Sequence, residues 1–456
     1  MNLSNKKRNL IFIVIVISTI VTSMLSTALT TALPAIINDL NISASKGQWL
    51  TSLYSLVMGI FVLCTAFLIK RFQTKALYLS SLGIFVIGLI VDVFAQSFQV
   101  LMIGRIFQAA GNGILLALAQ VILLTIYPIE KRGSIMGIYG LAVGAAPIIS
   151  PTLAGIIVDC FGWKMIFIGS LLICIVALIV TVFVFENILE NEKVSFDFMS
   201  LALCTIAFIG ITLGAGNIGS HSFVSFHVLD AIIIGVISGI LFVKRQLRLE
   251  QPFLDVSVFS NHRFRTAIMG SMLMYAILIA VSVLQPIYIQ TICGYTATVS
   301  GLIAMPGSIL MALINPVIGK LYDKIGIKIL FVTGAVLLVI SSGAFSIFTA
   351  TTSIILISGV NILRNMGIAC IMMPLVTYSV SEISESKVSA ATSLLTSLRT
   401  VAGSVGSAVF IATATIASTS TIDVHGINVA FVGMSAVSIM IFIIAVIGVK
   451  EEKKIV

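Results

Sequence analysis

The sequence predicts an all-α polytopic membrane protein with fourteen transmembrane helices, and three observations support this. First, 59% of the 456 residues are hydrophobic and only 9% are charged, whereas soluble proteins have about 25% charged residues. Second, long apolar runs recur along the chain, each near the roughly 20 residues that a spanning helix needs. Third, Lys and Arg concentrate in alternate loops. A soluble globule is excluded, because too little polar surface remains to cover it.

The apolar runs divide the chain into fourteen predicted spans. The first run follows Lys6, Lys7 and Arg8, and it is too long for a cleavable signal peptide. Charged or turn-forming residues separate each run from the next. The predicted spans are 10–33, 48–69, 76–95, 100–126, 133–158, 163–185, 198–217, 224–243, 266–291, 297–318, 327–348, 353–378, 389–417 and 428–449.

The basic residues orient these spans. With the N-terminus inside, 21 of the 26 Lys and Arg residues fall in inner loops and only Lys46 and Lys164 in outer loops. Cytoplasmic loops carry such an excess of Lys and Arg, so both termini are predicted to be cytoplasmic. The net charge of +9 is therefore a topology signal. The expected surroundings are a lipid bilayer, and no nucleic-acid partner is predicted.

Motifs for other chemistry are missing from the sequence. No G-x-x-x-x-G-K-[ST] occurs, so ATP is not predicted as a partner. The six cysteines form no C-x-x-C pair and no metal spacing, and we expect neither a metal nor another cofactor. The spans hold no cluster of His with carboxylates, so the chain is not predicted to be an enzyme.

An internal repeat indicates two related halves. Residues 66–75 and 319–328 share the pattern small-x-Leu-x-charged-basic-apolar-x-x-Lys, and Arg105 and Arg364 are separated by a similar offset. The sequence thus predicts an N-terminal half (1–197), two inserted helices (198–243), a cytoplasmic connecting loop (244–265) and a C-terminal half (266–456). Such repeats are typical of secondary transporters, whose substrate site lies between the halves near the bilayer midplane.

Several short motifs occur along the chain in a set order. Residues 319–328 fit G-x-L-x-D-x-x-G-x-K, residues 105–111 approach R-x-x-Q-G-x-G, and the fifth span carries a stripe of Gly and Pro. In this order they resemble the motifs of the major facilitator superfamily, specifically its fourteen-helix drug:proton antiporter branch. Further similar segments are Ala32-Leu33-Pro34, Arg364-Asn-Met-Gly367 and Arg399-Thr-Val-Ala-Gly403.

The resemblance implies a fold of two six-helix halves with two inserted helices, in a cell membrane that is most simply the bacterial cytoplasmic membrane. It also implies a small-molecule substrate and a proton as partners. The branch includes exporters of quaternary ammonium dyes and lincomycin-like drugs, so proton-coupled multidrug efflux and antibiotic resistance are the leading expectation. Two positions depart from the family pattern. The first helix has Leu25 and Ser26 where an acid is usual, and Lys70 replaces the usual Asp of the first loop.

Asp92 and Arg105 are the candidates for proton coupling. Each lies a similar distance from the outer end of its span, and a short loop joins the two spans. We therefore expect an ion pair at matched depth, in which the carboxylate exchanges a proton in place of the missing acid of the first helix. The alternative is a purely structural ion pair near the outer surface.

Other polar residues within spans are candidates to line the substrate cavity, since polar groups in lipid need a partner or water. On the first helix, Thr22, Ser26 and Thr30 form a hydroxyl row at i+4 spacing, which could equally serve close helix packing. The remaining candidates could also join helices to one another. They are Gln108, Asn112, Gln285, Asn361, Arg364, Asn365 and Arg399.

Two motifs are candidates for gating. The fifth-span stripe could form a flexible seam between the halves, because glycines allow close approach and prolines permit bending; simple tight packing is the alternative. In the other motif, Asp323 could hold the inner face shut by pairing with a neighbouring helix end or arginine. The gating candidates are Gly140, Gly144, Pro147, Pro151, Gly155, Gly319, Asp323, Gly326 and Lys328.

Two other functions stay open. A carrier for an endogenous metabolite or an organic anion is favoured by the three arginines within spans and by the missing acid of the first helix. A non-transporting membrane sensor on a transporter scaffold is the second alternative, although every loop is short and no signalling domain is present.

Overall fold

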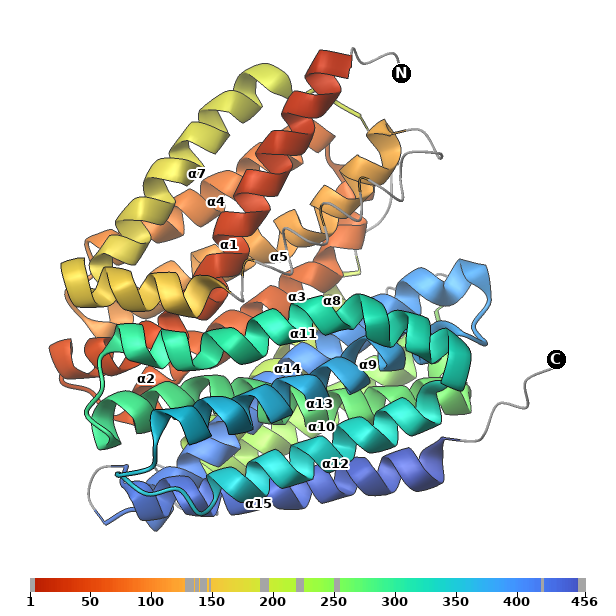
Figure 1. Ribbon diagram of the computed structural model, residues 1–456. Helices are drawn as coiled ribbons and strands as arrows, with labels where there is room; N and C mark the ends of the chain where they lie inside the picture. The colour runs from red at the N-terminus through yellow and green to blue at the C-terminus, as the bar shows by residue number, and fades with distance from the viewer. Residues whose placement is uncertain are drawn as a thin grey trace.

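The structure is a computed structural model that describes most of the chain as helices packed in two groups (Figure 1). No strand occurs within the described residues. Thirteen of their helices are long and apolar enough to cross a membrane, and Ile149–Phe161 is a shorter apolar helix. The described residues are 5–127, 135, 139, 146, 149–188, 197–218, 225–249, 255–419 and 422–449.

The first group of helices lies uppermost in Figure 1. Apart from residues 135, 139 and 146, the described part of the fifth predicted span belongs to the short helix Ile149–Phe161, which Gly162 connects to α7 with a left-handed φ of 82°. The first group consists of α1 (Asn5–Asp39), α2 (Ala44–Gly47), α3 (Trp49–Arg71), α4 (Thr74–Val93), α5 (Phe98–Ile126), Ile149–Phe161 and α7 (Lys164–Val184).

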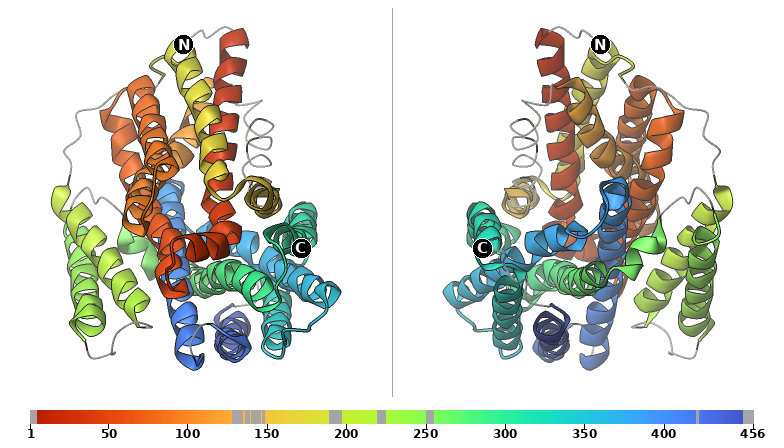
Figure 2. Two further views of the ribbon diagram at one scale, coloured as in Figure 1. Left: turned by 90° about the vertical axis from the view of Figure 1, so that its left-hand side faces the viewer. Right: turned by 90° about the vertical axis from the view of Figure 1, so that its right-hand side faces the viewer.

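The second group lies below it, and the helices α8 and α9 pack against each other on one flank (Figures 1 and 2). The flanking pair is α8 (Phe198–Asn217) and α9 (Ala231–Gln246), preceded by a π-helical turn (Phe226–Asp230). A 3₁₀ turn, η2 (Val256–Ser260), then leads into the second group. The second group consists of α10 (His262–Ile287), η3 (Tyr288–Ile292), α11 (Ala297–Ile325), α12 (Ile327–Phe345), α13 (Ile354–Val380), α14 (Glu385–Ala417), α15 (Val424–Ile443) and η4 (Ile444–Gly448).

Local side chains explain where several helices begin. Ser97, Asn261 and Thr296 each accept a hydrogen bond from a backbone N–H in the first turn of α5, α10 and α11. These oxygens satisfy donors that the helix itself leaves free. Between α11 and α12 the link is the single residue Gly326, whose φ of 75° suits a residue without a Cβ.

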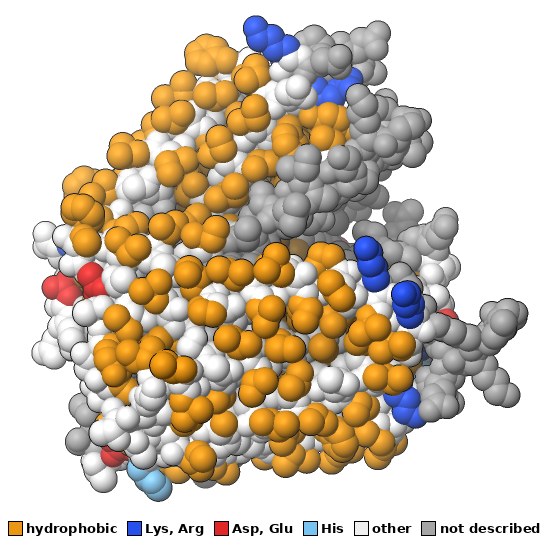
Figure 3. All heavy atoms as spheres, viewed as in Figure 1, with side chains coloured by type: hydrophobic (Ala, Val, Ile, Leu, Met, Phe, Trp, Pro, Cys, Tyr) orange, Lys and Arg blue, Asp and Glu red, His pale blue; other side chains and the backbone are white. Residues whose placement is uncertain are grey.

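The charged residues separate the two ends of the molecule. Most of the visible Lys and Arg gather on the side where both termini lie, and most of the visible acidic residues, with the visible His, lie on the opposite side (Figure 3). By the positive-inside rule the first side is cytoplasmic; we call it inner and the opposite side outer. The outer ends of α1 and α11 approach each other, and their inner ends lie far apart (Figure 1).

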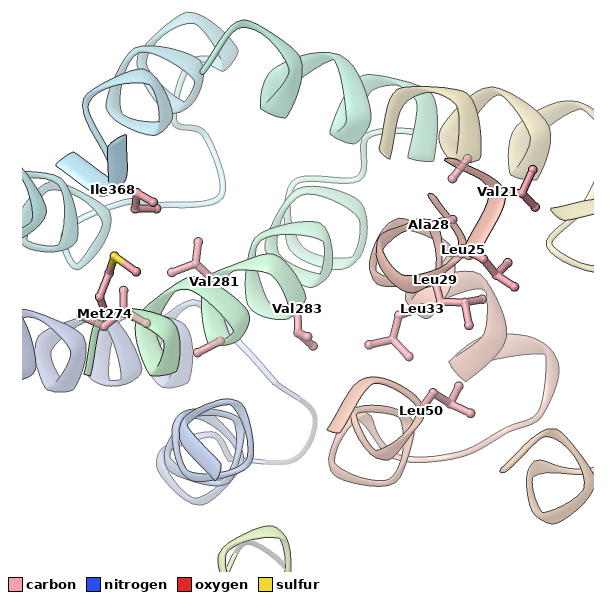
Figure 4. Close-up of a cluster of buried hydrophobic side chains, with 14 of the residues drawn as sticks. Val21, Leu25, Ala28, Leu29, Leu33, Leu50, Met274, Val281, Val283 and Ile368 are labelled. Atoms are coloured by element: carbon pink, nitrogen blue, oxygen red, sulfur yellow. The ribbon is translucent and has the colours of Figure 1, made fainter. Parts of the chain in front are cut away.

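Apolar side chains join the two groups at their boundary. A buried hydrophobic cluster includes Leu29 and Leu33 of α1, Leu50 of α3, and Val281 and Val283 of α10 (Figure 4). No charged pair is needed for this contact, because burial of apolar area and tight packing stabilise it. Such a surface can be separated and re-formed without exposing an unpaired charge to lipid.

Candidate functional site

A fully buried polar cluster connects α4 and α5 in the first group. Asp92 lies at the outer end of α4 and Arg105 about two turns into α5, and both residues are 0% exposed. Gln108, also fully buried, lies between them. Arg105 Nη1 donates a hydrogen bond of 2.8 Å to Gln108 Oε1, and Gln108 Nε2 donates one of 2.6 Å to Asp92 Oδ2.

The structure brings Asp92 and Arg105 into one cluster without the direct contact that the sequence suggested. Asp92 Oδ1 and Arg105 Nη2 have no hydrogen-bond partner among the described residues. Gln108 is one turn beyond Arg105 on the same face of α5, so its amide reaches both charged groups and keeps them apart. The cluster thus retains one free carboxylate oxygen and one free guanidinium nitrogen.

Arg105 also attaches this cluster to α3. Its guanidinium carbon lies 3.9 Å from the centroid of the Tyr54 ring, and its Nε donates a hydrogen bond of 3.3 Å to Leu50 O. Asn112 Nδ2 donates to Tyr54 Oη at 2.8 Å and so fixes the ring. A cation over a desolvated aromatic ring contributes about 2 kcal/mol. A change at Arg105 would therefore act directly on α3.

Two glycines make room for the carboxylate. A Cβ on Gly104 would lie 1.9 Å from Asp92 Oδ1, and one on Gly88 would lie 2.6 Å from Gly104 O. Close approach of α4 and α5 at these positions is therefore possible only without side chains. Gly104 belongs to none of the motifs found in the sequence, although its position beside Arg105 was a visible signal.

The second group has a different arrangement around its intramembrane arginine. Arg364 lies half-buried on α13, and its Nε and Nη1 have no hydrogen-bond partner among the described residues. Its neighbours Asn361 and Asn365 are directed at α11. Asn361 Nδ2 donates a long hydrogen bond of 3.5 Å to Ile303 O, and Asn365 Nδ2 would lie 2.5 Å from a Cβ on Gly307. Both amides therefore lie at a contact between helices.

Arg399 and Gln285 lie elsewhere in the second group. The guanidinium carbon of Arg399, on α14, is 4.9 Å from the centroid of the Tyr275 ring on α10. Gln285 is 4% exposed, and its Nε2 has no described partner. Within the described residues, no hydrogen bond links these side chains to an acid. The predicted cavity residues are thus spread over several helix contacts.

The hydroxyl row of α1 is satisfied within its own helix. Thr22, Ser26 and Thr30 donate to the backbone carbonyls three residues earlier, at 3.2, 2.6 and 2.7 Å. This is the usual way in which hydroxyls are accommodated inside a helix. The row requires no substrate to complete its hydrogen bonds, and a role in substrate binding stays a prediction.

Close backbone contacts join the two groups at the outer side. A Cβ on Gly155 would lie 2.4 Å from Ala297 O, and one on Gly301 would lie 2.5 Å from Pro151 O. Of the predicted fifth-span stripe, Pro151 and Gly155 therefore lie against α11. Gly140, Gly144 and Pro147 lie outside the described residues.

Asp159, which was not among the residues predicted from the sequence, completes this outer contact. Its two carboxylate oxygens accept hydrogen bonds from Ala297 N at 3.2 Å and Thr298 N at 2.7 Å. These donors belong to the first turn of α11, where a negative charge is stabilised. An acid at the end of an otherwise apolar span was the available signal, but its partners Ala297 and Thr298 lie 138 and 139 residues further along the chain.

A seam of uncharged, hydrogen-bonded side chains joins α3 of the first group to α14 of the second. Ser404 Oγ donates to Ser52 O at 2.8 Å, and Gln48 Oε1 accepts from Ser52 Oγ and Ser407 Oγ at 3.1 and 3.3 Å. All of these residues are buried. Because α3 also carries Leu50 and Tyr54, the seam and the Asp92 cluster share one helix.

Comparison with known proteins identifies the family. The sequence profile of the Major Facilitator Superfamily matches residues 15–407. The chain belongs to the Major Facilitator Superfamily. It is 34% identical over 385 residues to the lincomycin resistance protein LmrB of Bacillus subtilis, with 84% of this chain and 80% of LmrB covered. It is 28% identical to the multidrug export protein EmrB of Haemophilus influenzae, over 84% of this chain and 75% of EmrB.

A solved structure of a POT family transporter, in complex with a thioalcohol-conjugated peptide, shares the fold. Its TM-score is 0.73 at 17% identity, with 97% of this chain and 96% of that chain covered. The predicted fold class, the fourteen-helix major facilitator fold, is confirmed together with the multi-pass location in the cell membrane. As a member of this transporter superfamily, the chain acts on small-molecule substrates.

The structure describes only part of the inner loop motif at residues 319–328. Gly326 supplies the left-handed turn between α11 and α12, Lys328 is half-buried, and a Cβ on Gly319 would meet open space. The side chain of Asp323 lies outside the described part of the structure. The inner latch at Asp323 therefore stays a prediction.

Proposed function

We propose that this protein is a proton-coupled exporter of amphipathic drugs, with Asp92 as the proton carrier. The observation that supports this most is the fully buried Asp92 carboxylate, which has one oxygen without a described partner. A free oxygen can accept a proton without first breaking a hydrogen bond. The names of LmrB and EmrB, which refer to lincomycin resistance and multidrug export, support the substrate class.

The moving bodies in this proposal are the halves 1–197 and 266–456. Protonation of Asp92 removes the negative charge that balances Arg105 through Gln108. Arg105 then changes its contacts with Leu50 and Tyr54, and this displaces α3 relative to α14 at the Ser52–Ser404 contact. One proton gains about 2.3 kcal/mol per 100 mV and about 1.4 kcal/mol per pH unit, which is sufficient to drive modest accumulation of a drug.

Inverted membrane vesicles with an imposed pH gradient test this function. Wild-type protein should accumulate ethidium and lose the accumulated dye when nigericin collapses the gradient. The variant Asp92→Asn should lose gradient-driven accumulation but keep downhill dye exchange, because only coupling is removed. Asp230→Asn is a matched control, since Asp230 is exposed at the outer side on the turn before α9.

Two results would reject the proposal in separable ways. Gradient-driven accumulation at the wild-type rate in Asp92→Asn would exclude Asp92 as the carrier while retaining drug export. Failure of the wild-type protein to move ethidium, lincomycin or other amphipathic drugs under any gradient would reject drug export itself.

The second candidate function is transport of an organic anion or a metabolite, which Arg364 favours. Its buried nitrogens have no described partner, and a carboxylate or phosphate would satisfy them with charge-assisted hydrogen bonds. In the same vesicles, uptake of anions that is lost in Arg364→Gln, together with no movement of cationic dyes, would favour this function over drug export.

A further inference from the structure

An apolar groove lies on the flank of the molecule, apart from the polar clusters. It has a volume of about 620 Å³ and is walled by the inserted helices α8 and α9, by α3 and by α14. Its walls include Phe208 of α8, Gly239 and Val243 of α9, Leu63 of α3 and Leu398 of α14. The α8–α9 pair, which forms the wall of the groove farthest from the two groups, lies at the side of these groups in Figure 2. Sites for organic ligands commonly have about 300–1,000 Å³, so the groove can hold a sizeable molecule.

The depth of the groove matches one leaflet of a bilayer. Along α9 it extends from Lys244 at the inner end to Gly235, which at 1.5 Å per residue is about 14 Å. The hydrocarbon core of a membrane is about 30 Å thick, so this is about half of it. Val256 and Phe259 of η2, on the cytoplasmic connection, border the inner end. The groove thus extends from the inner headgroups to near the bilayer centre.

The charge at its inner end is positive. Lys244 is the charged residue among the lining residues, and its side chain is exposed. The adjacent Arg245 forms an ion pair with Asp197, with its Nη2 2.9 Å from Asp197 Oδ1, and it does not line the groove. Asp255 also forms an ion pair, because Lys387 Nζ lies 3.0 Å from its Oδ2. No ion pair joins Lys244 to any residue that the structure describes.

From this geometry we propose that the groove binds one anionic phospholipid of the inner leaflet. An acyl chain fills the apolar channel, and the lipid phosphate lies at Lys244. A zwitterionic lipid offers the same chain but no net negative charge, so the ammonium of Lys244 selects the anionic lipid. A cationic amphiphile would be repelled at the same position.

The position of this lipid relates it to the transport cycle. Its site has walls from both halves, namely α3 of the first and α14 of the second, with Ser397 Oγ of α14 only 3.5 Å from Gly59 O of α3. The α8–α9 pair is itself tightly joined, since a Cβ on Gly210 would lie 2.6 Å from Ala231 O. A lipid between the α8–α9 pair and the α3–α14 contact would stabilise the arrangement in which the outer ends of α1 and α11 lie close together.

Native mass spectrometry of the purified full-length protein tests the binding site. The protein in detergent is titrated with palmitoyl-oleoyl phosphatidylglycerol or with the corresponding phosphatidylcholine. Wild-type protein should bind one phosphatidylglycerol at least about fivefold more tightly than phosphatidylcholine, the preference expected for one lysine near a membrane surface. Lys244→Gln should weaken phosphatidylglycerol binding about fivefold and leave phosphatidylcholine binding unchanged.

A groove-filling variant tests the apolar part. A Cβ on Gly239 meets only Ala207 Cβ at 3.7 Å, so the ring of Gly239→Phe should enter the groove and abolish the tightly bound lipid. The controls are Ile237→Phe on the exposed face of α9 and Arg248→Gln nearby, both outside the lining residues; neither should change binding.

Four results would overturn the proposal. Equal binding of the two lipids by the wild-type protein would exclude an anionic site. An equal loss of binding in Arg248→Gln and Lys244→Gln would indicate general attraction to a basic surface. If folded Gly239→Phe bound the lipid as the wild type does, the lipid would lie elsewhere. If Lys244→Gln, a variant at an exposed site, bound phosphatidylglycerol as the wild type does, the lipid headgroup would lie away from this lysine.

Discussion

Arg105 and Arg364 lie at positions that the sequence pattern relates to each other, yet their surroundings differ. Arg105 is fully buried, stacked on Tyr54 and joined through Gln108 to the Asp92 carboxylate. Arg364 is half-buried, and its Nε and Nη1 have no partner within the described residues. The first arrangement contains its own counter-charge, whereas the second does not.

This difference indicates that the two groups of helices can serve different tasks. A buried charge is strongly destabilising unless it is paired and hydrogen-bonded. In the first part the protein supplies that pairing, so the cluster can change state when a proton arrives. In the second part a positive charge is left available for another molecule or for another state of the transport cycle.

The largest expected effect separates the two arginines directly. Arg105→Leu should destabilise the protein by about 3–5 kcal/mol, because it leaves the buried Asp92 charge unbalanced. Arg364→Leu should cause no loss, since it removes buried nitrogens that have no described partner. Thermal unfolding of both variants in the same detergent measures the difference.

A double variant checks the cause of that destabilisation. In the Arg105→Leu background, Asp92→Asn should restore part of the stability, because it removes the unbalanced charge. Equal losses for Arg105→Leu and Arg364→Leu would show that the two arginines are supported alike and would end the comparison.

The next effect concerns the space around the carboxylate. Gly104→Ala would place a Cβ 1.9 Å from Asp92 Oδ1, so we expect a loss of about 1–3 kcal/mol and impaired proton coupling. The matched change in the second half is Gly359→Ala on α13, where a Cβ meets nothing within 4 Å. It should be neutral or slightly stabilising, since Ala favours a helix. Unfolding temperature and substrate-induced proton release measure both effects.

A smaller effect is expected where the two halves meet. Asp159→Ala removes the carboxylate that caps α11 from the other half, and the loss of a cap costs about 1 kcal/mol. Outward opening would separate Asp159 from α11, so without these bonds it should become about fivefold more frequent. The measurement is labelling of Ser404→Cys, a buried seam position, by an impermeant thiol reagent in a chain whose native cysteines are serine.

Asp39→Ala provides the control for that measurement. Asp39 also accepts a hydrogen bond at the outer surface, but from Trp163 Nε1 at 3.0 Å within the same half. Its loss should leave labelling of Ser404→Cys unchanged. Equal increases in the two variants would mean that Asp159 acts through local stability and has no specific effect on closure.

The smallest effect lies at the inner end of the inserted helices. Burial tends to raise the pKa of the Asp197 carboxyl, but hydrogen bonds from Arg245 and Ser200 outweigh it and hold this pKa below its ordinary value. A depressed pKa in the folded state stabilises the fold above the unfolded pKa of about 3.9, and the contribution disappears as pH falls through the lowered value.

Asp197→Asn should therefore lower the stability by less than about 1 kcal/mol at pH 7, and the difference from wild type should shrink as pH falls below about 4. Thermal unfolding at both pH values measures this. A difference that stays constant with pH would assign the effect to shape and not to charge.

Much of the fold could be predicted from residues that lie close together in the chain. The length of each apolar run and the placement of Lys and Arg were enough to predict the spans, and the ends differ by a few residues, as in α1 (Asn5–Asp39 against 10–33). Hydrophobic length and the positive-inside bias act locally on each segment. Gly326 was singled out by its place in the G-x-L-x-D-x-x-G-x-K motif, but the predicted spans left residues 319–326 as a loop, and the structure instead continues α11 to Ile325 and makes Gly326 a one-residue link.

The functional clusters could be predicted only in part. Asp92 and Arg105 were found because a charge within a span is costly wherever it lies, but the bridging role of Gln108 and the support from Tyr54 depend on how α3, α4 and α5 are rotated. Asn361 and Asn365 were expected to line a cavity, and the structure directs them at α11. The direction in which these side chains point depends on how the helices pack, and the spacing of residues along one helix does not reveal it.

The sequence by itself predicted a membrane protein with fourteen spans and a defined orientation, since these follow from hydrophobicity and charge within each segment, and transport was implied by the repeat and the resemblance to the superfamily's motifs. Only the tertiary structure decided that Gln108 separates Asp92 from Arg105, that Asp159 caps α11 across the halves, and that an apolar groove ends at Lys244. These contacts join residues from different helices, and the rotation and depth of each helix arise from the packing of all the others.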